Sequence, residues 1–315
     1  MIKVINAGIL TTVQDLGRKY FRAFGVPKAG AMDDFSSRVA NLLVGNDENA
    51  PLLELTIVGG SYLFEEDTLI ALTGADMSAS CGGKPLANWQ SHFIKAGQQL
   101  EFAFATKYCR SYLAVAGGIK VETIMGSCST HIRAKFGGFE GRALKAGDVL
   151  QVGEVSDKSK LREIPLPEEL RLALADVPVI RVLTGPQADA FTADTFDNLQ
   201  KDEYTIALDS DRMGYRLSGH ILSHNETGAD IVSDALIEGA VQVPGDGQPI
   251  IMLSDCQTTG GYTKLCFVIS SDLPVLVQCR PGDKIRFKLI SEEESLNILR
   301  EYQNKLDKIR VFLKN

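Results

Sequence analysis

The chain has 315 residues, of which 44% are hydrophobic and 23% charged, a composition typical of a globular protein with a full apolar core and a length that suggests about two domains. Its formal net charge of −7 argues against a nucleic-acid partner, because phosphate binding requires a cationic face. Residues 1–15 carry a single Lys and no long apolar run, and no window of 18 apolar residues exists, so we expect no secretory signal, no membrane span and a cytoplasmic location.

Glycine is plentiful, at 29 residues, whereas long helical patterns are few, and this balance indicates β structure with many turns. In the first half, Asp33 or Asp34 is expected to cap a short helix that runs through Ser36 to Leu43. Residues 126–142 are polar and glycine-rich, which predicts an extended loop. The expected strands of this half are residues 2–5, 52–58, 62–64, 69–72, 100–104, 112–116 and 149–152.

The stretch 154–170 is rich in Glu, Pro, Ser and Lys, which predicts a linker between two domains, 1–155 and 175–315. Near the C-terminus, Ser291 and Glu294 form a capping box for a last helix. One apolar stripe marks the buried face of that helix: Leu296, Leu299, Leu306 and Ile309. The second half is expected to hold short helical turns at 188–191 and 194–199 and strands at 179–183, 204–208, 250–253, 265–269 and 284–290.

The cysteines and histidines show no pattern that favours a metal site. His220 and His224 stand four apart, but they follow Gly219 in a segment with little helical character, so we expect no metal there. No cysteine lies within four residues of another, so the usual spacing of zinc ligands is absent. We therefore expect buried, reduced thiols at Cys81, Cys109, Cys128, Cys256, Cys266 and Cys279.

The stretch 238–262 is the most informative part of the chain. A Pro-Gly-Asp-Gly turn at 244–247 precedes the apolar run 250–253, and polar residues follow at once. Polar groups at the end of a buried strand cost free energy unless something binds them. Two interpretations stay open: an Asp/Thr-rich turn that closes a hairpin, or the lip of a site for a small polar ligand. We expect Lys264, just past the polar run, to place its cation beside Asp255.

The two halves share landmarks in the same order, with similar spacing. They are Gly8 and Gly185 after a strand, Met32 and Met213 in a turn, Glu54 and Glu238, and Gly97 and Gly282 before a strand. This agreement predicts two copies of one β-rich unit, a kind of unit that usually closes into a sandwich or barrel. Chance spacing of common glycine turns is the alternative.

Motifs in the same order carry a family resemblance over essentially residues 1–290: TTVQDLGR (11–18), GVPKAGAMD (25–33), YLAVAGGI (112–119), SDRMGYRL (210–217) and VQVPGDGQPI…QTTGGYTK (241–264). They resemble the biotin-dependent carboxyltransferase family, which includes allophanate hydrolase subunit 2 and the C-type subunit of 5-oxoprolinase. The resemblance implies a mainly β fold of two tandem cyclophilin-like β-barrel domains with short helices and a C-terminal helix. Two positions depart from the family pattern: Cys256 stands where members often carry Arg, and Thr263 replaces a frequent Pro.

The function implied by the resemblance is an ATP-dependent 5-oxoprolinase that opens 5-oxoproline to glutamate. The chain would act with two partner proteins of that enzyme, a B-type subunit (an allophanate hydrolase subunit 1 homologue) and an A-type subunit. One alternative is the carboxyltransferase half of a biotin-dependent urea-type carboxylase, and another is a non-catalytic module that binds a kinase-inhibitor partner. The chain has no biotinyl-lysine motif, and Gly82-Gly83-Lys84 lacks the remainder of a phosphate loop, so partner chains are expected to supply the sites for ATP or biotin.

Chemistry on a cyclic amide requires a group that holds the N–H and a cation for the developing oxyanion. The predicted catalytic residues are Asp255, Gln257 and Lys264 in the second half and Asp15 and Arg18 in the first. The structural alternatives are an Asp15–Arg18 salt bridge that pins a loop, an Arg212 that braces backbone carbonyls, and a plain β-bulge at 260–261. The predicted substrate-binding residues are Asp33, Arg212, Gln248, Thr258, Thr259, Gly260, Gly261 and Tyr262.

Overall fold

The computed structural model describes residues 1–155 and 157–314. These residues form two compact units, of which the first holds residues 1–18, 29–172 and those from Lys305 onward, and the second holds residues 19–28 and 173–304. The expected halves differ from this division in two places. Residues 19–28 pack with the second unit, and the end of the terminal helix packs with the first. The described residues of the expected linker belong to the first unit, while Ser156 in that linker and Asn315 lie outside the described residues.

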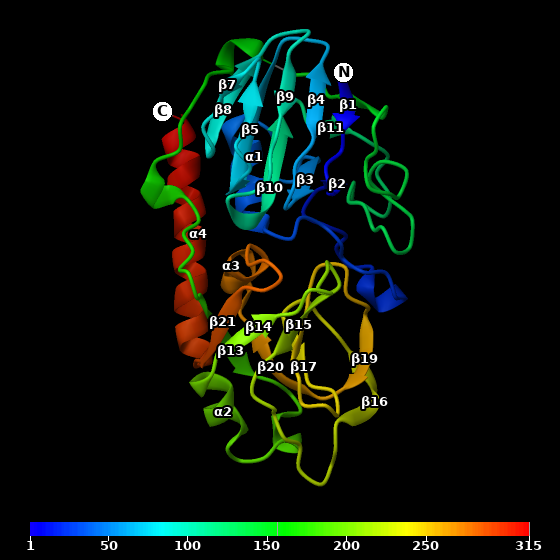
Figure 1. Ribbon diagram of the computed structural model, residues 1–315, viewed down its shortest axis with the longest axis vertical. Helices are drawn as coiled ribbons and strands as arrows, with labels where there is room; N and C mark the ends of the chain where they lie inside the picture. Colours follow the sequence, from blue (N-terminus) through cyan, green and yellow to red (C-terminus); the bar gives the residue numbers. More distant parts are fainter. Residues whose placement is uncertain (156, 315) are drawn as a thin grey trace. The chain divides into compact units, whose positions relative to one another are not determined.

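The first unit is built on two β-sheets (Figure 1). The seven-stranded sheet has the order β11-β12-β1-β4-β9-β6-β7, with bounds Ile119–Lys120, Val149–Val152, Ile2–Asn6, Ser61–Phe64, Gln99–Glu101, Ser80–Cys81 and Lys84–Pro85. The five-stranded sheet has the order β2-β3-β10-β5-β8, with bounds Leu10–Gln14, Leu52–Thr56, Lys107–Val115, Thr68–Asp76 and Gln90–Ile94. Each range expected as a strand in this half contains strand residues, and both sheets supply side chains to one apolar core.

Strand β2 was not predicted from the sequence because three of its five residues are polar. Thr11, Thr12 and Gln14 are nevertheless buried, at 0%, 1% and 0% exposure. Their polar atoms are held inside the protein: the Thr11 hydroxyl donates to the Ala7 carbonyl at 2.6 Å, and the Gln14 amide donates to the Thr12 hydroxyl at 2.9 Å. A polar strand of this kind lacks the apolar alternation by which strands are recognised.

The second unit contains a closed barrel with the strand order β13-β20-β17-β18-β15-β14-β21 (Figure 1). The bounds in that order are Val179–Thr184, Lys264–Val268, Ala240–Gln242, Ile250–Met252, Gly214–Ser218, Tyr204–Ile206 and Lys284–Leu289. Two further strands, β16 (Asp230–Ala235) and β19 (Thr259–Tyr262), pair with each other as a separate two-stranded sheet. Every strand predicted for the second half is therefore present.

Helices are few and mostly short. The first unit holds α1 (Asp34–Leu43), η2 (Lys158–Lys160) and η3 (Glu168–Leu170), and the second holds η1 (Arg22–Phe24), η4 (Ala188–Ala190), α2 (Thr195–Lys201), η5 (Ser270–Asp272) and α3 (Leu273–Val277). The long helix α4 (Glu292–Lys314) ends the chain. Its predicted N-cap is confirmed, because the Ser291 hydroxyl accepts from the Glu294 backbone N–H at 3.1 Å. The predicted apolar stripe is only partly correct: Leu306 and Ile309 are buried, but Leu296 is 53% exposed.

The prediction of a mainly β fold with short helices and a C-terminal helix is confirmed. The described strands close into a barrel in the second unit, whereas those of the first unit form two sheets. The six cysteines are reduced thiols, five of them buried and Cys128 half-buried, as the spacing predicted. None of the described helices combines the length and the apolarity that crossing a bilayer requires.

Candidate active site

Asp255 and Arg212 form a buried ion pair in the second unit. Asp255 Oδ2 lies 3.0 Å from Arg212 Nε and Asp255 Oδ1 lies 3.0 Å from Arg212 Nη2, the two-pronged geometry that a guanidinium offers a carboxylate. Both residues are 5% exposed. The backbone supports the pair, because the Asp255 N–H donates to the Arg212 carbonyl at 3.0 Å. Arg212 thus holds a carboxylate, a contact that the alternative of a carbonyl brace did not include.

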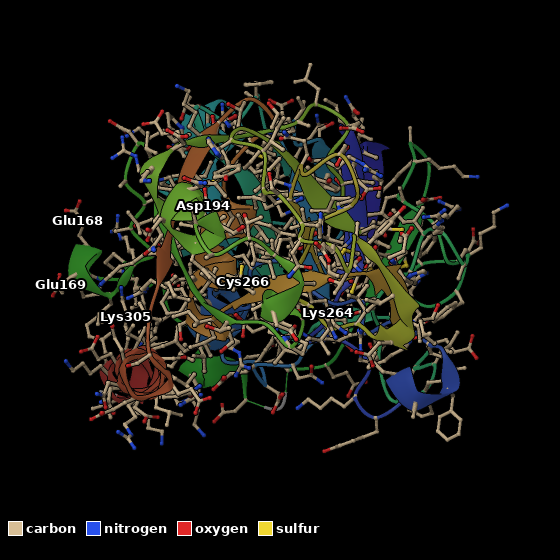
Figure 2. The ribbon with its side chains drawn as sticks, turned by 90° about the horizontal axis from the view of Figure 1, so that it is seen from below. Glu168, Glu169, Asp194, Lys264, Cys266 and Lys305 are labelled. Carbon is tan, nitrogen blue, oxygen red and sulfur yellow. The ribbon has the colours of Figure 1, made fainter. Side chains whose placement is uncertain are left out.

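Lys264 does not lie beside Asp255, so that expectation was wrong. Its ammonium bonds to Asp234 Oδ2 at 2.5 Å and to the Ala235 carbonyl at 2.9 Å, both at the end of β16. The reason is twofold: Asp255 already holds a guanidinium, and the short β16–β19 sheet brings Asp234 within reach of the lysine. Lys264 is 3% exposed at the start of β20, where Figure 2 shows it with Cys266 farther along the same strand. The hydrogen bond from Lys264 holds the pKa of the Asp234 carboxyl below its usual value.

The polar run after Asp255 leads into β19. Gln257 is exposed, and the Thr258 carbonyl accepts from the Leu236 N–H at 2.9 Å. A β-carbon on Gly260 would lie 2.7 Å from Gln242 Nε2, so the end of the Gln242 side chain packs closely over this glycine. The register between β16 and β19 also shifts beside the glycines, in agreement with the β-bulge alternative. The other predicted binding residues here, Thr259, Gly261 and Tyr262, complete β19.

Gln248 is occupied by a structural contact. Its Oε1 accepts from the Gly219 N–H at 2.9 Å and its Nε2 donates to the Gly219 carbonyl at 3.3 Å. Both polar atoms of this side chain thus brace a neighbouring segment, and a role in binding substrate stays a prediction.

A second ion pair of this unit was not predicted from the sequence. Lys28 Nζ lies 2.9 Å from Glu238 Oε2, and the Ser254 hydroxyl donates to Glu238 Oε1 at 2.6 Å. Burial acts to raise the pKa of Glu238, but Lys28, Ser254 and Arg212 outweigh it and hold that pKa below its usual value. Two signals pointed towards this pair: Lys28 lies within one of the family motifs, and Glu238 is a landmark of the duplication.

Arg22 is the other functional candidate that the sequence did not reveal. Its Nη2 donates to the Leu236 carbonyl, to the Gln257 carbonyl at 3.4 Å and to Cys256 Sγ at 3.8 Å. Arg22 therefore brings a guanidinium to the Cys256 thiol.

These contacts unite seven charged residues of the second unit, which we call the charge cluster: Arg22, Lys28, Arg212, Lys264, Asp234, Glu238 and Asp255. Two short segments hold most of it together. Residues 234–238 accept hydrogen bonds from three of the four cations, and residues 254–257 supply Ser254, Asp255 and the acceptors for Arg22. The polar run that the sequence singled out is thus one wall of a charged, largely buried arrangement.

Asp15 is the centre of a buried network in the first unit. Its Oδ1 accepts from the Gly17 N–H at 2.8 Å, from the Ser127 hydroxyl at 2.7 Å and from the Ser129 hydroxyl, and its Oδ2 accepts from the Cys128 N–H at 2.6 Å. Arg18 Nη2 donates to the Ser129 carbonyl at 2.5 Å. Both side chains therefore hold residues 127–129 of the loop 126–142, a contact that differs from the salt bridge of the structural alternative.

We expect Asp15→Ala to lower the thermal unfolding midpoint clearly, because each buried donor that loses its acceptor costs about 1–3 kcal/mol. Thermal melting followed by circular dichroism measures the effect. Glu66→Ala is the matched control, since that carboxylate is exposed and its contact is with the N-terminal ammonium. A midpoint for Asp15→Ala equal to that of the control would contradict a structural role for the network.

Asp33 is the cap of α1. Its Oδ1 accepts from the Ser36 N–H at 2.8 Å and its Oδ2 accepts from the Ser36 hydroxyl at 2.5 Å. The Tyr112 hydroxyl holds the backbone of the cap in place, because it accepts from the Asp33 N–H and donates to the Glu54 carboxylate, each at 2.8 Å. Burial and then the Glu54 charge raise the pKa of Tyr112 well above its usual value. The capping role predicted for Asp33 is confirmed, and its predicted role in binding substrate gains no support from these contacts.

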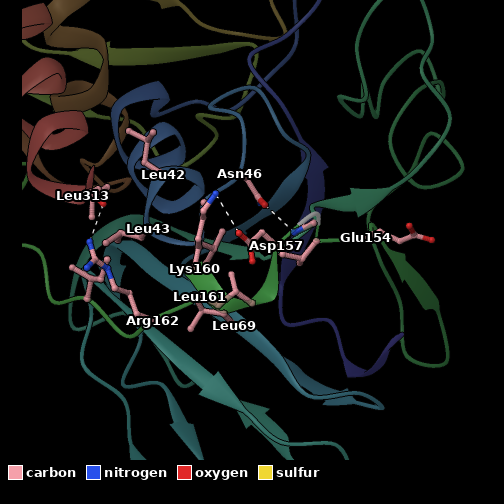
Figure 3. Close-up of a pocket in the computed structure, with 15 residues that line it drawn as sticks. Leu42, Leu43, Asn46, Leu69, Glu154, Asp157, Lys160, Leu161, Arg162 and Leu313 are labelled. Atoms are coloured by element: carbon pink, nitrogen blue, oxygen red, sulfur yellow. Dashed lines mark hydrogen bonds and ion pairs between the residues drawn. The ribbon is translucent and has the colours of Figure 1, made fainter. Parts of the chain in front are cut away.

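A cavity of about 380 Å³ in the first unit is a second candidate site (Figure 3). It is lined by the end of α1, by Asn46 and by residues near Lys160 and Arg162. Lys160 lies 3.2 Å from Asp157, Arg162 donates to the Leu313 carbonyl at 3.1 Å, and none of the predicted site residues lines the cavity. Across residues 1–155 and 157–314, no group of three or more His, Cys, Asp or Glu side chains is placed to hold a metal ion.

Comparison with known proteins gives full-length matches. The C-type subunit of 5-oxoprolinase from Escherichia coli is 41% identical over 315 residues, which cover 100% of this chain and 99% of that protein. The C-type subunit of 5-oxoprolinase from Haemophilus influenzae is 38% identical over 311 residues, which cover 98% of each. The urea amidolyase of Saccharomyces cerevisiae is 31% identical over 315 residues, but these cover only 17% of that protein.

A solved structure and a family model agree with these relatives. The crystal structure of the Kluyveromyces lactis urea carboxylase matches with a TM-score of 0.92 at 29% identity, over 98% of this chain and 29% of that chain. The family model described as "Carboxyltransferase domain, subdomain A and B" matches residues 24–289. The resemblance read from the motifs is thereby confirmed, and the chain belongs to the carboxyltransferase domain family.

Proposed function

We propose that the chain is the C-type subunit of a multi-subunit, ATP-dependent 5-oxoprolinase and opens 5-oxoproline to glutamate together with a B-type and an A-type partner protein. The observation that carries this proposal is the length of the match. Both 5-oxoprolinase relatives align with this chain from end to end, whereas the aligned region is a minor part of the urea amidolyase.

The charge cluster is the part of the chain best suited to this chemistry. Opening a lactam requires a polar group that holds the ring N–H and a cation near the carbonyl oxygen, where negative charge develops. We assign the first task to Asp255 and Gln257, which follow the buried strand β18, and the second to Lys264. Arg212 fixes the Asp255 carboxylate in one orientation, so it acts as a positioning residue. Asp15 and Arg18 contribute by holding the 126–142 loop.

A nucleotide site is not formed by the Gly-Gly-Lys sequence at 82–84. There Cys81 pairs with Lys84 across a two-residue hairpin turn, in which Gly82 and Gly83 have φ angles of 56° and 76°. A phosphate-binding loop instead leads from a strand into the N-terminus of a helix. We therefore place ATP on the partner proteins.

Reconstitution tests the proposal. The chain alone should show no turnover of 5-oxoproline, and addition of the two partner proteins should release glutamate and ADP without biotin. Avidin should leave the reaction unchanged. Dependence on bicarbonate and a biotinylated carrier, with inhibition by avidin, would identify a urea-type carboxyltransferase instead. Full activity after Asp255, Gln257 and Lys264 are each replaced by Ala would indicate a non-catalytic binding module.

A further inference from the structure

The charge cluster is not electrically balanced. It holds four cations and three carboxylates, and each carboxylate is matched to one cation: Asp255 to Arg212, Glu238 to Lys28 and Asp234 to Lys264. Arg22 remains, and its partners are neutral. Two of them are the carbonyls of Leu236 and Gln257, and the third is the Cys256 thiol.

The thiol does not supply the missing negative charge. Cys256 is 0% exposed, and burial raises the pKa of its thiol although Arg22 opposes that shift. At neutral pH the sulfur is therefore protonated, and the contact with Arg22 leaves the positive charge in place.

The Arg22 guanidinium also has N–H groups that can still donate hydrogen bonds. All three of its contacts are made by Nη2, and neither Nε nor Nη1 makes a hydrogen bond to the residues that the structure describes. The side chain is half-buried, so water screens its charge less than on an open surface. A half-buried cation with unused N–H groups, beside exposed Gln257, is a fitting partner for an anion.

We propose that Arg22 binds the carboxylate of the substrate, so that the site takes a lactam that carries one negative charge. This inference rests on the proposed function. 5-Oxoproline fits the charge balance, because an α-carboxyl group with a pKa of about 3.5 is ionised at neutral pH and gives a monoanion. The single carboxylate of the substrate then compensates the one cation that the cluster leaves unmatched.

The test is a comparison of two substrates in the reconstituted complex. Arg22→Gln removes the charge and should raise the KM for 5-oxoproline roughly ten- to hundredfold, the effect of losing a hydrogen bond to a charged group. The same variant should leave the KM for 2-pyrrolidone within about twofold, because this lactam has no carboxylate for Arg22 to bind. Arg22→Lys keeps the charge and should recover part of the affinity.

Arg286→Gln is the matched control, because Arg286 is an exposed arginine of the same unit that pairs with Glu203. It should leave both KM values unchanged. An Arg22→Gln complex with an unchanged KM for 5-oxoproline, or with both substrates weakened equally, overturns the inference and leaves the proposed function standing.

Equilibrium dialysis of labelled 5-oxoproline separates the two proposals if turnover is absent. Arg22-dependent binding by a wild-type complex without turnover supports the carboxylate site and contradicts the proposed reaction. Absence of binding to the wild-type complex contradicts both, and equal binding by wild type and Arg22→Gln contradicts the carboxylate site alone. Thermal melting of Arg22→Gln and Arg22→Lys identifies any loss that comes from unfolding.

Discussion

Asp255→Ala is expected to lower the free energy of unfolding by about 3–5 kcal/mol and to abolish turnover by the reconstituted complex. The variant removes the carboxylate but leaves the Arg212 guanidinium at 5% exposure, where a charge that has lost its counter-ion is costly. Urea unfolding followed by circular dichroism measures the first effect, and glutamate release measures the second.

A double variant separates the structural role of this pair from its catalytic role. Arg212→Met with Asp255→Leu removes both charges and fills the space with apolar side chains, a replacement that is often neutral for stability. We expect it to recover most of the lost stability while turnover stays absent. An active double variant would show that the pair only supports the fold, and a single variant as stable as wild type would show that water reaches Arg212.

Many of the strands were predictable from the sequence because their signal is local, whereas β8, β15, β16, β17 and β19 were not predicted. Alternation or short apolar runs marked β1, β10 and β21, and turn residues marked where they end. β2 escaped because Thr11, Thr12 and Gln14 are buried through hydrogen bonds made with backbone and neighbouring hydroxyls. Burial of polar side chains cannot be read from hydropathy, so this strand looked like a loop.

The partners of the charged residues were not predictable, because they depend on contacts between distant segments. Lys264 lies nine residues from Asp255 in sequence but pairs with Asp234, which is 30 residues away. Arg22 is 214 residues from Leu236, and Lys28 is 210 residues from Glu238. The duplication singled out Glu238, but the spacing of a repeat does not show which residue pairs with it. The sequence could therefore single out the stretch 238–262, but not the distant side chains that pack against it.

Lys264→Met and Asp234→Ala remove opposite ends of one ion pair, and we expect unequal effects on stability. Lys264 is almost fully buried, whereas Asp234 is half-exposed. Lys264→Met leaves a carboxylate that water can solvate and replaces a buried charge by an apolar side chain of similar length, so the melting temperature should change little. Asp234→Ala instead leaves a buried ammonium with the Ala235 carbonyl as its remaining partner, so it should melt at a clearly lower temperature.

Turnover should follow the opposite order. If Lys264 stabilises the developing oxyanion, Lys264→Met lowers kcat on the order of a hundredfold or more, the usual scale for the loss of one such partner. Asp234→Ala keeps the ammonium and should retain more of the activity at temperatures where it is folded. The two variants should therefore rank in opposite order: Asp234→Ala has the lower melting temperature, and Lys264→Met has the lower kcat. A Lys264→Met complex with unchanged kcat would contradict the assignment of Lys264 to the developing oxyanion.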